Sequence, residues 1–399
     1  MRKNFSALTL IFLTVFIDLL GFGLLIPVLP SFGVNVLKID ETLIGIAISL
    51  YSLTQFLFNP IFGKISDKKG RKPVILFCLF LNGLGYLIFA FTNNYLMLLI
   101  SRVIAGIGGS SISVAQAYIA DMTTSENRAK GMGLIGSAFG LGFVFGPLLG
   151  GILAEYGYDI VGYVSAGFSF AALILTSFML PESLKISTNT DKIKSEKRKI
   201  RLINIQSFKY VFIKPDLGLL ISLFFILTFS FANIYGTFAL LGIQVYGFSD
   251  KQNGYMFGIT GIVSALVQGV FIGKISKFIN KKTIIIIGSL LVSLNLGLIP
   301  YAANFLGLAI VSVFLSIGTG LLQPTVLSLI SEVTSESEQG MILGINQSMS
   351  AFARMLGPLW GGFAFEYLGY PFPFLTGAFF TAIMFLIAIF YLPKKINLN

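Results

Sequence analysis

Three charged side chains lie inside long apolar stretches of this 399-residue chain: Asp18, Arg102 and Arg354. A charge inside a hydrocarbon layer is costly, so such residues mark ion, proton or substrate pathways by default. A carboxylate can carry a proton, and an arginine can hold an anionic group. The chain has no histidine and one cysteine, Cys78, which excludes histidine-based sites and a disulfide framework. We therefore expect no metal and no other cofactor.

The apolar stretches have the length and composition of membrane-spanning helices. The sequence is 55% hydrophobic and only 11% charged, less than half of the charged fraction of a soluble protein. A helix needs about 20 apolar residues to cross a hydrocarbon layer. This predicts an all-α membrane protein with twelve transmembrane helices. They are expected at residues 6–30, 42–63, 73–92, 95–120, 131–154, 159–180, 216–245, 252–273, 283–303, 305–330, 340–365 and 371–392. The first run contains Asp18 and is not expected to be a cleaved signal peptide.

Basic residues alternate between successive connections. The connections on the opposite side of the membrane hold only two basic residues, Lys38 and Lys251. Basic connections stay in the cytoplasm, which predicts a multi-pass protein of the cell membrane with both termini in the cytoplasm. The basic connections lie at residues 2–3, 64–72, 128–130, 185–214, 274–282 and 394–395.

An internal repeat divides the chain into two halves. GKIS at 63–66 recurs at 273–276, and GPLLGG at 146–151 recurs as GPLWGG at 357–362. The repeat predicts a six-helix bundle at 1–180, a basic linker at 181–215 and a second bundle of the same orientation at 216–399. The linker run KIKSEKRKIR (192–201) either binds anionic lipid head groups or is a solvated connection.

Several ordered motifs carry a family resemblance. GKISDKKGRKPV (63–74) resembles the loop motif of the major facilitator superfamily. Four further segments resemble the tetracycline-efflux branch of its twelve-span drug–proton antiporters. They are IDLLGFGLLIPVLP (17–30), SLYSLTQFLFNP (49–60), RVIAGIGGSSISVAQAYIAD (102–121) and GLGFVFGPLLGG (140–151). The resemblance implies two parallel six-helix bundles with a substrate path between them.

The loop motif supplies a candidate latch between the halves, made by Gly63, Asp67, Gly70, Arg71 and Asp121. In the family the loop acid and arginine hold the cytoplasmic side closed. By resemblance, Asp67 would face the start of the 340–365 span, and Arg71 would pair with Asp121. The second copy of the motif has a lysine, Lys277, where the acid would be, so only the first latch is expected to be complete. The alternative is that the basic loop only sets topology.

A candidate hinge lies in the glycine-rich spans of both halves: Gly146, Pro147 and Gly150 in the first, Gly357 and Pro358 in the second. Glycines four residues apart let helices approach closely, and proline can kink a helix. These residues serve either a rocking hinge, as the resemblance implies, or helix packing alone.

Asp18 and Arg102 are the candidate proton-coupling residues. A rise of about 1.5 Å per residue puts both at a similar depth in their spans. They would then form a pair that exchanges partners when a proton or substrate arrives, with Arg102 tuning the acid. The alternative is a static ion pair that joins two helices.

Polar residues in the spans outline a candidate substrate site. Arg354 shares a stride of four with Asn346 and Ser350, and either holds an anionic or polar substrate group or has a structural role. Tyr51, Gln55 and Asn59 form a similar stripe. Isolated polar residues either line the same cavity or join helices by hydrogen bonds. They are Asn82, Gln116, Asn233, Tyr235, Gln244, Gln268, Asn295 and Gln323.

The leading functional hypothesis is secondary active export of lipophilic or amphiphilic small molecules in exchange for protons, by alternating access. The partners are then a small-molecule substrate, protons and membrane lipid, with no nucleic acid and a monomeric state. In the 73–92 span, Gly85 stands where tetracycline–metal exporters carry an acid, and the 283–303 span contains no acid. The sequence therefore lacks the carboxylates expected to bind a tetracycline–metal complex.

Two alternatives keep the fold but change the task, namely flipping of a lipid or glycolipid and proton-coupled import of a small solute. An enzyme or receptor is not expected, because no nucleophile–base set can be assembled without histidine. GIGGSS (106–111) lacks the P-loop lysine, which argues against ATP as the energy source.

Overall fold

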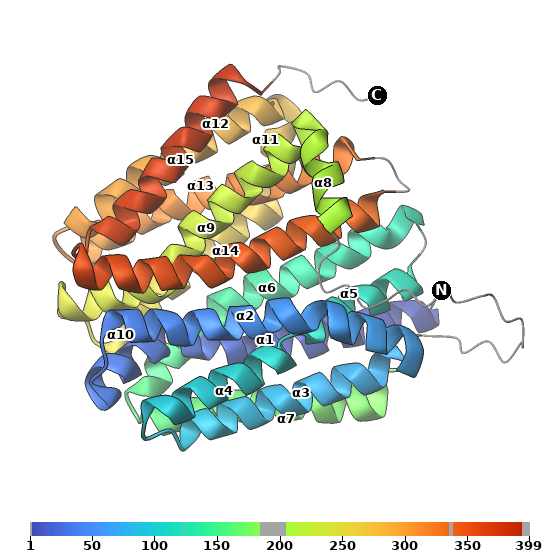
Figure 1. The fold of residues 1–399 in the computed structure, drawn as a ribbon, viewed down its shortest axis with the longest axis horizontal. Helices are drawn as coiled ribbons and strands as arrows, with labels where there is room; N and C mark the ends of the chain where they lie inside the picture. Colours follow the sequence, from blue (N-terminus) through green and yellow to red (C-terminus); the bar gives the residue numbers. More distant parts are fainter. Residues whose placement is uncertain (1, 124, 184–204, 335–337, 393–399) are drawn as a thin grey trace, which may run out of the picture.

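The computed structural model describes residues 2–123, 125–183, 205–334 and 338–392, and every element in these ranges is helical (Figure 1). The first half contains α1 (Arg2–Phe32), η1 (Gly33–Leu37), α2 (Glu41–Lys69), α3 (Arg71–Ala90), α4 (Tyr95–Gly108), α5 (Ser111–Met122), α6 (Ser125–Ala154) and α7 (Tyr158–Met179). The second half contains α9 (Pro215–Gln244), α10 (Asp250–Leu266), η2 (Val267–Phe271), α11 (Ile272–Phe278), α12 (Lys281–Leu298), η3 (Ile299–Tyr301), α13 (Phe305–Glu332), α14 (Gln339–Tyr367) and α15 (Phe372–Phe390).

These helices make the twelve spans expected from hydropathy. Eleven helical stretches of the described residues are long and apolar enough to cross a membrane, and the more polar α14 runs beside them as the twelfth (Figure 1). The expected span at 95–120 is interrupted, because α4 ends at Gly108 and α5 begins at Ser111. Asn94 and Asn304 cap the first turns of α4 and α13, which explains where these two helices begin.

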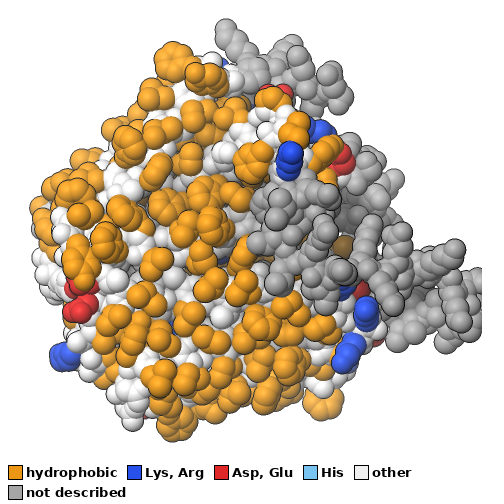
Figure 2. All heavy atoms as spheres, in the orientation of Figure 1, with side chains coloured by type: hydrophobic (Ala, Val, Ile, Leu, Met, Phe, Trp, Pro, Cys, Tyr) orange, Lys and Arg blue, Asp and Glu red, His pale blue; other side chains and the backbone are white. Residues whose placement is uncertain are grey.

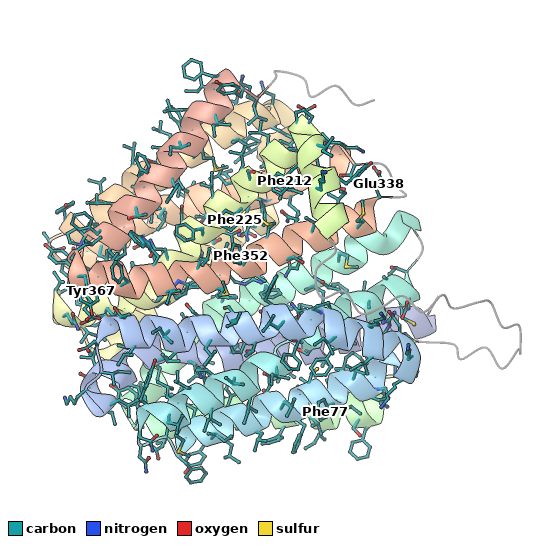
Figure 3. The ribbon with its side chains drawn as sticks, in the orientation of Figure 1. Phe77, Phe212, Phe225, Glu338, Phe352 and Tyr367 are labelled. Carbon is teal, nitrogen blue, oxygen red and sulfur yellow. The ribbon has the colours of Figure 1, made fainter. Side chains whose placement is uncertain are left out.

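The segment between the halves, predicted as a basic linker at 181–215, contains a helix. Helix α8 (Ile205–Ile213) occupies its C-terminal part, whereas the basic run at 192–201 lies outside the described residues. Tyr210 of α8 hydrogen-bonds to Glu338, next to the start of α14, and Lys214 forms a 3.2 Å ion pair with the same carboxylate (Figure 3). The end of the linker is therefore tied to α14.

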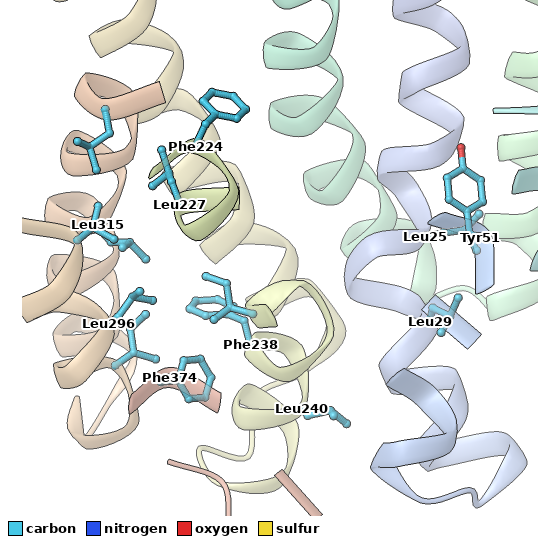
Figure 4. Packing of buried hydrophobic residues seen from close by; sticks show 14 of the residues in the cluster. Leu25, Leu29, Tyr51, Phe224, Leu227, Phe238, Leu240, Leu296, Leu315 and Phe374 are labelled. Atoms are coloured by element: carbon cyan, nitrogen blue, oxygen red, sulfur yellow. The ribbon is translucent and has the colours of Figure 1, made fainter. Parts of the chain in front are cut away.

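The outer surface has the character of a membrane protein. Figure 2 shows a mostly apolar face whose visible charged side chains lie toward its two ends. Large side chains such as Phe77 and Phe178 are exposed on it or elsewhere on the surface. Inside the bundles, leucines and aromatic residues pack around Phe238 and Phe374 in the second half (Figure 4). Cys78 is fully buried in a separate apolar cluster of the first half.

The two halves close against each other at one end of the molecule. We call the side where α1 begins and α15 ends the terminal side, and the opposite side the far side. At the far side α2 crosses α14 and α6 crosses α10 so closely that only glycine fits. A Cβ on Gly45 would lie 2.3 Å from the carbonyl oxygen of Pro358, and one on Gly151 would lie 2.7 Å from the Cα of Gly254.

Polar contacts between the halves reinforce this far-side closure. Glu155 forms a 3.3 Å ion pair with Lys251, and the Tyr158 hydroxyl donates to Asp250 at 2.9 Å. Two further contacts complete the group: Gln244 donates to Glu41 at 2.6 Å, and the Thr42 amide donates to Glu366 at 3.0 Å. Each of these four contacts joins one half to the other.

The same four helices stand apart toward the terminal side. A Cβ added to Gly63, Gly133, Gly273 or Gly344 would meet no atom within 4 Å. Three of these glycines lie on α2, α6 and α14, and Gly273 lies on α11, which continues α10 after η2. The structure is therefore closed on the far side and separated on the terminal side.

Candidate functional site

A cavity lies between the two bundles, on the terminal side of the glycine crossings. The space in it that no protein atom fills is about 970 Å³, a volume that includes open solvent. Most of the lining is apolar and comes from α1, α2, α5 and α6, while α9 and α14 contribute from the second half. The lining residues are Leu19, Phe22, Leu25, Ile26, Leu29, Ile48, Tyr51, Ser52, Gln55, Asn59, Arg102, Ile112, Ser113, Gln116, Phe139, Phe143, Tyr235, Gln347, Arg354 and Pro358.

The polar stripe on α2 lines this cavity as expected. Tyr51, Gln55 and Asn59 all contribute to its wall, and so does Gln116 of α5. The Gln55 amide donates to the carbonyl oxygen of Gly109 at 2.8 Å, at the break between α4 and α5. Asn59 has a buried side-chain oxygen without a hydrogen-bond partner. The stripe therefore combines a residue that joins helices with polar atoms that remain available to a ligand.

A row of aromatic rings crosses the cavity from one half to the other. Phe22 packs on Tyr51 with ring centroids 4.8 Å apart, and its other neighbour is Phe143 at 5.9 Å. Phe143 stacks on Tyr235 of α9, again at 5.9 Å. Offset and edge contacts at these distances are favourable. The row provides an extended aromatic surface for a lipophilic ligand.

On α14 the cavity face differs from the expected one. Arg354 lines the cavity, but its neighbour there is Gln347, while Asn346 and Ser350 are buried away from it. A stride of four residues drifts by about 40° around a helix, whereas a stride of seven drifts by only about 20°. Gln347 and Arg354 therefore share a face more closely than Asn346 and Arg354 do.

Two other candidate substrate residues also lie elsewhere. Asn233 is fully buried in α9, where its amide donates to the Pro373 carbonyl at 2.5 Å. It thus joins α9 to α15, which is the helix-joining alternative. Gln323 of α13 is exposed on the surface and does not line the cavity. Neither residue is part of the candidate site.

Asp18 lies behind the cavity wall, inside the first bundle. Its Oδ1 accepts hydrogen bonds from Asn82 at 2.9 Å and from Ser169 at 3.0 Å. Its Oδ2 accepts from Asn82 at 2.9 Å and from Ser111 at 3.1 Å. A buried carboxylate needs such donors to offset its lost hydration. Asp18 thereby connects α1, α3, α5 and α7.

The expected contact between Asp18 and Arg102 is absent from the described residues, so the static ion pair is wrong for this structure. Side chains lean toward the N-terminus of their own helix. Because α1 begins on the terminal side and α4 begins on the far side, the two side chains lean in opposite directions. Along α3, Asp18 meets Asn82, whereas Arg102 lies over the rings of Tyr86 and Phe89, further toward the far side.

The loop motif forms a compact charge cluster on the terminal side. Arg71 pairs with Asp67 at 2.5 Å and with Asp121 at 2.9 Å, as expected for Asp121, and also donates to Ser66. Gly70, which ends α2, has a positive φ of 99°. The expected contact of Asp67 with the start of the 340–365 span falls at the beginning of α14, where the side chains of residues 339–340 lie outside the described residues. The cluster seen here lies entirely within the first half.

The second half contains a counterpart that the sequence argument missed. Lys281 forms an ion pair with Glu332, and these residues follow Arg71 and Asp121 by 210 and 211 positions. Lys277 is exposed and stands where the acid would be. The second half thus repeats the basic–acid pair, with lysine in place of arginine, but not the loop acid, so only the first half carries the complete set of latch residues.

The glycines of the candidate hinge are points of close helix contact within each half. A Cβ on Gly146 would lie 2.6 Å from the Cα of Gly23 on α1, and one on Gly150 would lie 2.1 Å from the Leu24 carbonyl oxygen. Gly357 meets Asn233 of α9 in the same manner, at 2.7 Å. Pro147 and Pro358 lie inside α6 and α14. The packing half of the expectation is thus visible in the contacts.

The family-level comparison agrees with this architecture. The model of the Major Facilitator Superfamily matches residues 11–294 and 266–397. The chain belongs to the Major Facilitator Superfamily. Relatives and a solved structure match nearly the whole length of the chain, and so include both bundles.

Three relatives place this superfamily member more closely. Multidrug resistance protein 2 of Bacillus subtilis (strain 168) is 28% identical and covers 95% of this chain and 94% of its own. Tetracycline resistance protein, class C, of Escherichia coli is 30% identical and covers 91% and 90%. The crystal structure of the human organic anion transporter MFSD10 (TETRAN) superposes with a TM-score of 0.71 at 25% identity, over 96% and 99%.

Several cavity residues of this superfamily member escaped the sequence argument. Phe22, Phe139 and Phe143 are three of 40 phenylalanines, so residue type alone did not single them out. Gln347 lies seven residues before Arg354, and a test of that stride would have found it. Ser169, which donates a hydrogen bond to Asp18, could not be singled out from the sequence, because small hydroxyl residues are common in membrane spans.

Proposed function

We propose that the protein exports lipophilic or amphiphilic small molecules across the cell membrane in exchange for protons. The cavity between the halves, closed on the far side and bordered by the Asp18 network, carries this proposal. The multidrug and tetracycline resistance proteins to which the chain is similar support efflux as the task. With the termini in the cytoplasm, as the positive-inside rule predicts, the cavity faces the cytoplasm and can receive substrate there.

Alternating access follows from the two ends of the interface. Substrate enters from the terminal side, the halves close there, and the far-side crossings separate. The glycines that are open in this structure, such as Gly63 and Gly344, then become the points of close approach. The Arg71 cluster serves as the latch of that closed state, and the α6 and α14 segments around Pro147 and Pro358 serve as hinges.

Asp18 carries the proton in this scheme. Asp18 accepts hydrogen bonds from Asn82, Ser111 and Ser169, and these donors suit its ionised form. The Asn82 side-chain oxygen is buried without a partner. Turning the Asn82 amide over would present that oxygen to a protonated Asp18, and the serine hydroxyls can also accept. The network can therefore satisfy both protonation states, and exchange between them shifts contacts among four helices.

Reconstituted Asp18→Asn protein tests the proposal. An amide of nearly the same shape keeps the packing but cannot release a proton at neutral pH. We expect uphill transport of a fluorescent lipophilic dye, driven by an imposed pH gradient in liposomes, to be lost, while downhill exchange of the dye persists. Full accumulation by the variant would exclude Asp18 as the proton carrier.

A matched control comes from the second half. Thr228 stands 210 residues after Asp18, and its hydroxyl donates only to its own helix, to the Phe224 carbonyl at 2.8 Å. Thr228→Val should keep pH-driven accumulation. Native protein that accumulates no compound against its gradient, with or without a pH difference, would contradict the proposed function itself.

A further inference from the structure

The cavity lining contains two guanidinium groups, and no carboxylate lines it among the described residues. Arg102 comes from α4 of the first half and Arg354 from α14 of the second. Asp18, the acid inside the first bundle, is behind the wall and is occupied by its own hydrogen-bond donors. The cavity is therefore electropositive in the state that the structure shows.

Arg102 is buried without a counter-charge. Arg102 is only 2% exposed, and its Nε donates a hydrogen bond to the Ser101 hydroxyl oxygen at 3.2 Å. The guanidinium carbon lies 5.4 Å from the Phe89 ring centroid, a distance at which a cation is attracted to the ring face. One terminal nitrogen, Nη2, is buried with no hydrogen-bond partner. A buried donor of this kind is costly unless something accepts from it.

Arg354 approaches the cavity from the opposite half. It is half-buried and forms no ion pair among the described residues. Its electrostatic neighbours are the tyrosines at the two ends of the aromatic row, Tyr51 and Tyr235. Two like charges thus face one cavity from two bodies that have to move relative to each other.

We propose that the substrate is an amphiphilic organic anion whose carboxylate, sulfonate or phosphate group binds between Arg102 and Arg354. Its lipophilic body packs on the aromatic row of Tyr51, Phe22 and Phe143. This rests on the proposed export function and specifies its substrate class. The anion supplies the acceptor that Arg102 Nη2 lacks, and guanidinium groups bind such planar acceptors well.

The position of the two arginines also links binding to movement. An anion held by one residue of each half cancels the repulsion between two cations across the cavity. Loading then favours approach of the halves on the terminal side, whereas the empty cavity resists it. A cationic compound of the same shape would add a third positive charge and would bind least.

Three naphthalene compounds with one ring system test the charge preference. They are 2-naphthalenesulfonate, 2-naphthylmethanol and 2-naphthylmethylammonium, titrated onto purified protein with ligand-induced thermal stabilisation as the readout. We expect the sulfonate to bind at least about tenfold more tightly than the alcohol, and the ammonium compound to bind weakest. Affinity for the sulfonate should fall as salt rises.

Substitutions then assign the preference to the two arginines. Arg354→Gln and Arg102→Met should each weaken sulfonate binding by about tenfold or more, with binding of the alcohol unchanged. Arg354→Lys should retain most of the affinity for the sulfonate, because the charge remains. Lys277→Gln is the control, since it removes an exposed positive charge on α11 outside the cavity lining. Arg354 is half-buried, so its Gln and Lys variants decide the matter even if Arg102→Met fails to fold.

The proposal is overturned if the ammonium compound binds native protein as tightly as the sulfonate, or if both arginine variants bind the sulfonate normally. Tighter, Arg354-dependent binding of dihexanoylphosphatidylglycerol than of the sulfonate would also overturn it, because the bound anion would then be a lipid head group. Transport separates this inference from the function on which it rests. Asp18-dependent, pH-driven accumulation of a neutral or cationic dye would leave export intact even where anion preference fails.

Discussion

The two bundles share the contacts that let helices move and differ in the residues that carry charge. Gly146 meets α1 as Gly357 meets α9, and Gly151 meets α10 as Gly362 meets α2. Both members of each pair are 211 residues apart in the sequence. The crossings are thus built twice from one pattern.

The polar residues inside the first bundle are not repeated in the second. At an offset of 210, the buried acid Asp18 corresponds to Thr228, and Arg102 corresponds to Ser312. Asn82 corresponds to Val292, which is buried in an apolar cluster. The second bundle therefore has no counterpart of the Asp18 network. The comparison teaches that the repeated residues supply the geometry of rocking, and the unrepeated ones supply the chemistry.

The largest effects are expected at the repeated crossings. Gly45→Leu and Gly254→Leu would each force the far-side crossing apart. Overpacking costs about 1–3 kcal/mol, which corresponds to about a 5- to 150-fold loss of the far-closed state. We expect both variants to lower the rate of pH-driven transport in liposomes to a similar degree. Clearly unequal losses would break the equivalence of the two crossings.

Gly344→Leu is the matched variant at the other end of the same interface. Its Cβ has open space in the structure seen here, so the far-closed state should tolerate it. Transport should still slow, because the terminal side could no longer close. Labelling of cavity residues from the terminal side should therefore increase in Gly344→Leu and decrease in Gly45→Leu. The same direction of change in both would contradict the rocking scheme.

An intermediate effect is expected at the two charge clusters. Arg71 has a side chain only 9% exposed and two acidic partners, whereas Lys281 is 32% exposed with one. Removing one partner of a buried pair is more damaging than removing one at the surface. We expect Arg71→Gln to slow transport by about tenfold and Lys281→Gln by about twofold or less. Initial rates at saturating substrate measure the difference, and equal rates would remove the asymmetry.

Asp67→Asn isolates the latch from the rest of that cluster. The Asp67 side chain is 59% exposed, so its loss should disturb the fold little. We expect slower turnover at nearly unchanged substrate affinity, because the latch stabilises a conformation and does not contact substrate. A rate equal to that of the native protein would leave Asp67 with a role in topology alone.

The last comparison concerns the free energy of unfolding, for which the unrepeated interior of the first bundle should differ from the second without any change in transport rate being measured. Arg102→Met removes a buried, uncompensated charge and places an apolar side chain beside Tyr86 and Phe89, so the ligand-free protein should become more stable by about 1–3 kcal/mol. Ser312→Ala removes only an unpartnered hydroxyl and should change stability by about 1 kcal/mol or less. Thermal unfolding midpoints without ligand check the order. Destabilisation by Arg102→Met would mean that its guanidinium has stabilising partners.

Much of the fold was predictable because it depends on quantities that a sequence carries directly. Span lengths follow from hydropathy, and the two halves follow from the GKIS and GPLLGG repeats. The α2 stripe was found because Tyr51, Gln55 and Asn59 lie four residues apart on one helix and all line the cavity. The break between α4 and α5 was missed, since Gly108 to Ser110 reads as an ordinary small-residue packing segment.

The misplaced site residues share one physical cause. Depth along a helix axis gives the position of a Cα but not the direction of its side chain. The side chains of Asp18 and Arg102 lean in opposite directions. Asn233 and Gln323 have suitable chemistry, but helix rotation turns one into the bundle core and the other to the surface. The pair of Lys281 and Glu332 was not predicted, because Lys277 stands one turn before Lys281 at the position of the loop acid and makes the second copy of the motif look incomplete.

The burial of Cys78 makes the molecule convenient for spectroscopy. The chain has one cysteine, and its side chain is 0% exposed in the apolar cluster around α3. Buried thiols of this kind react poorly, so the native protein presents no competing site to a maleimide spin label or fluorophore. Cysteines introduced at Gly63 and Gly344 would then report the distance between the halves without first removing a native residue.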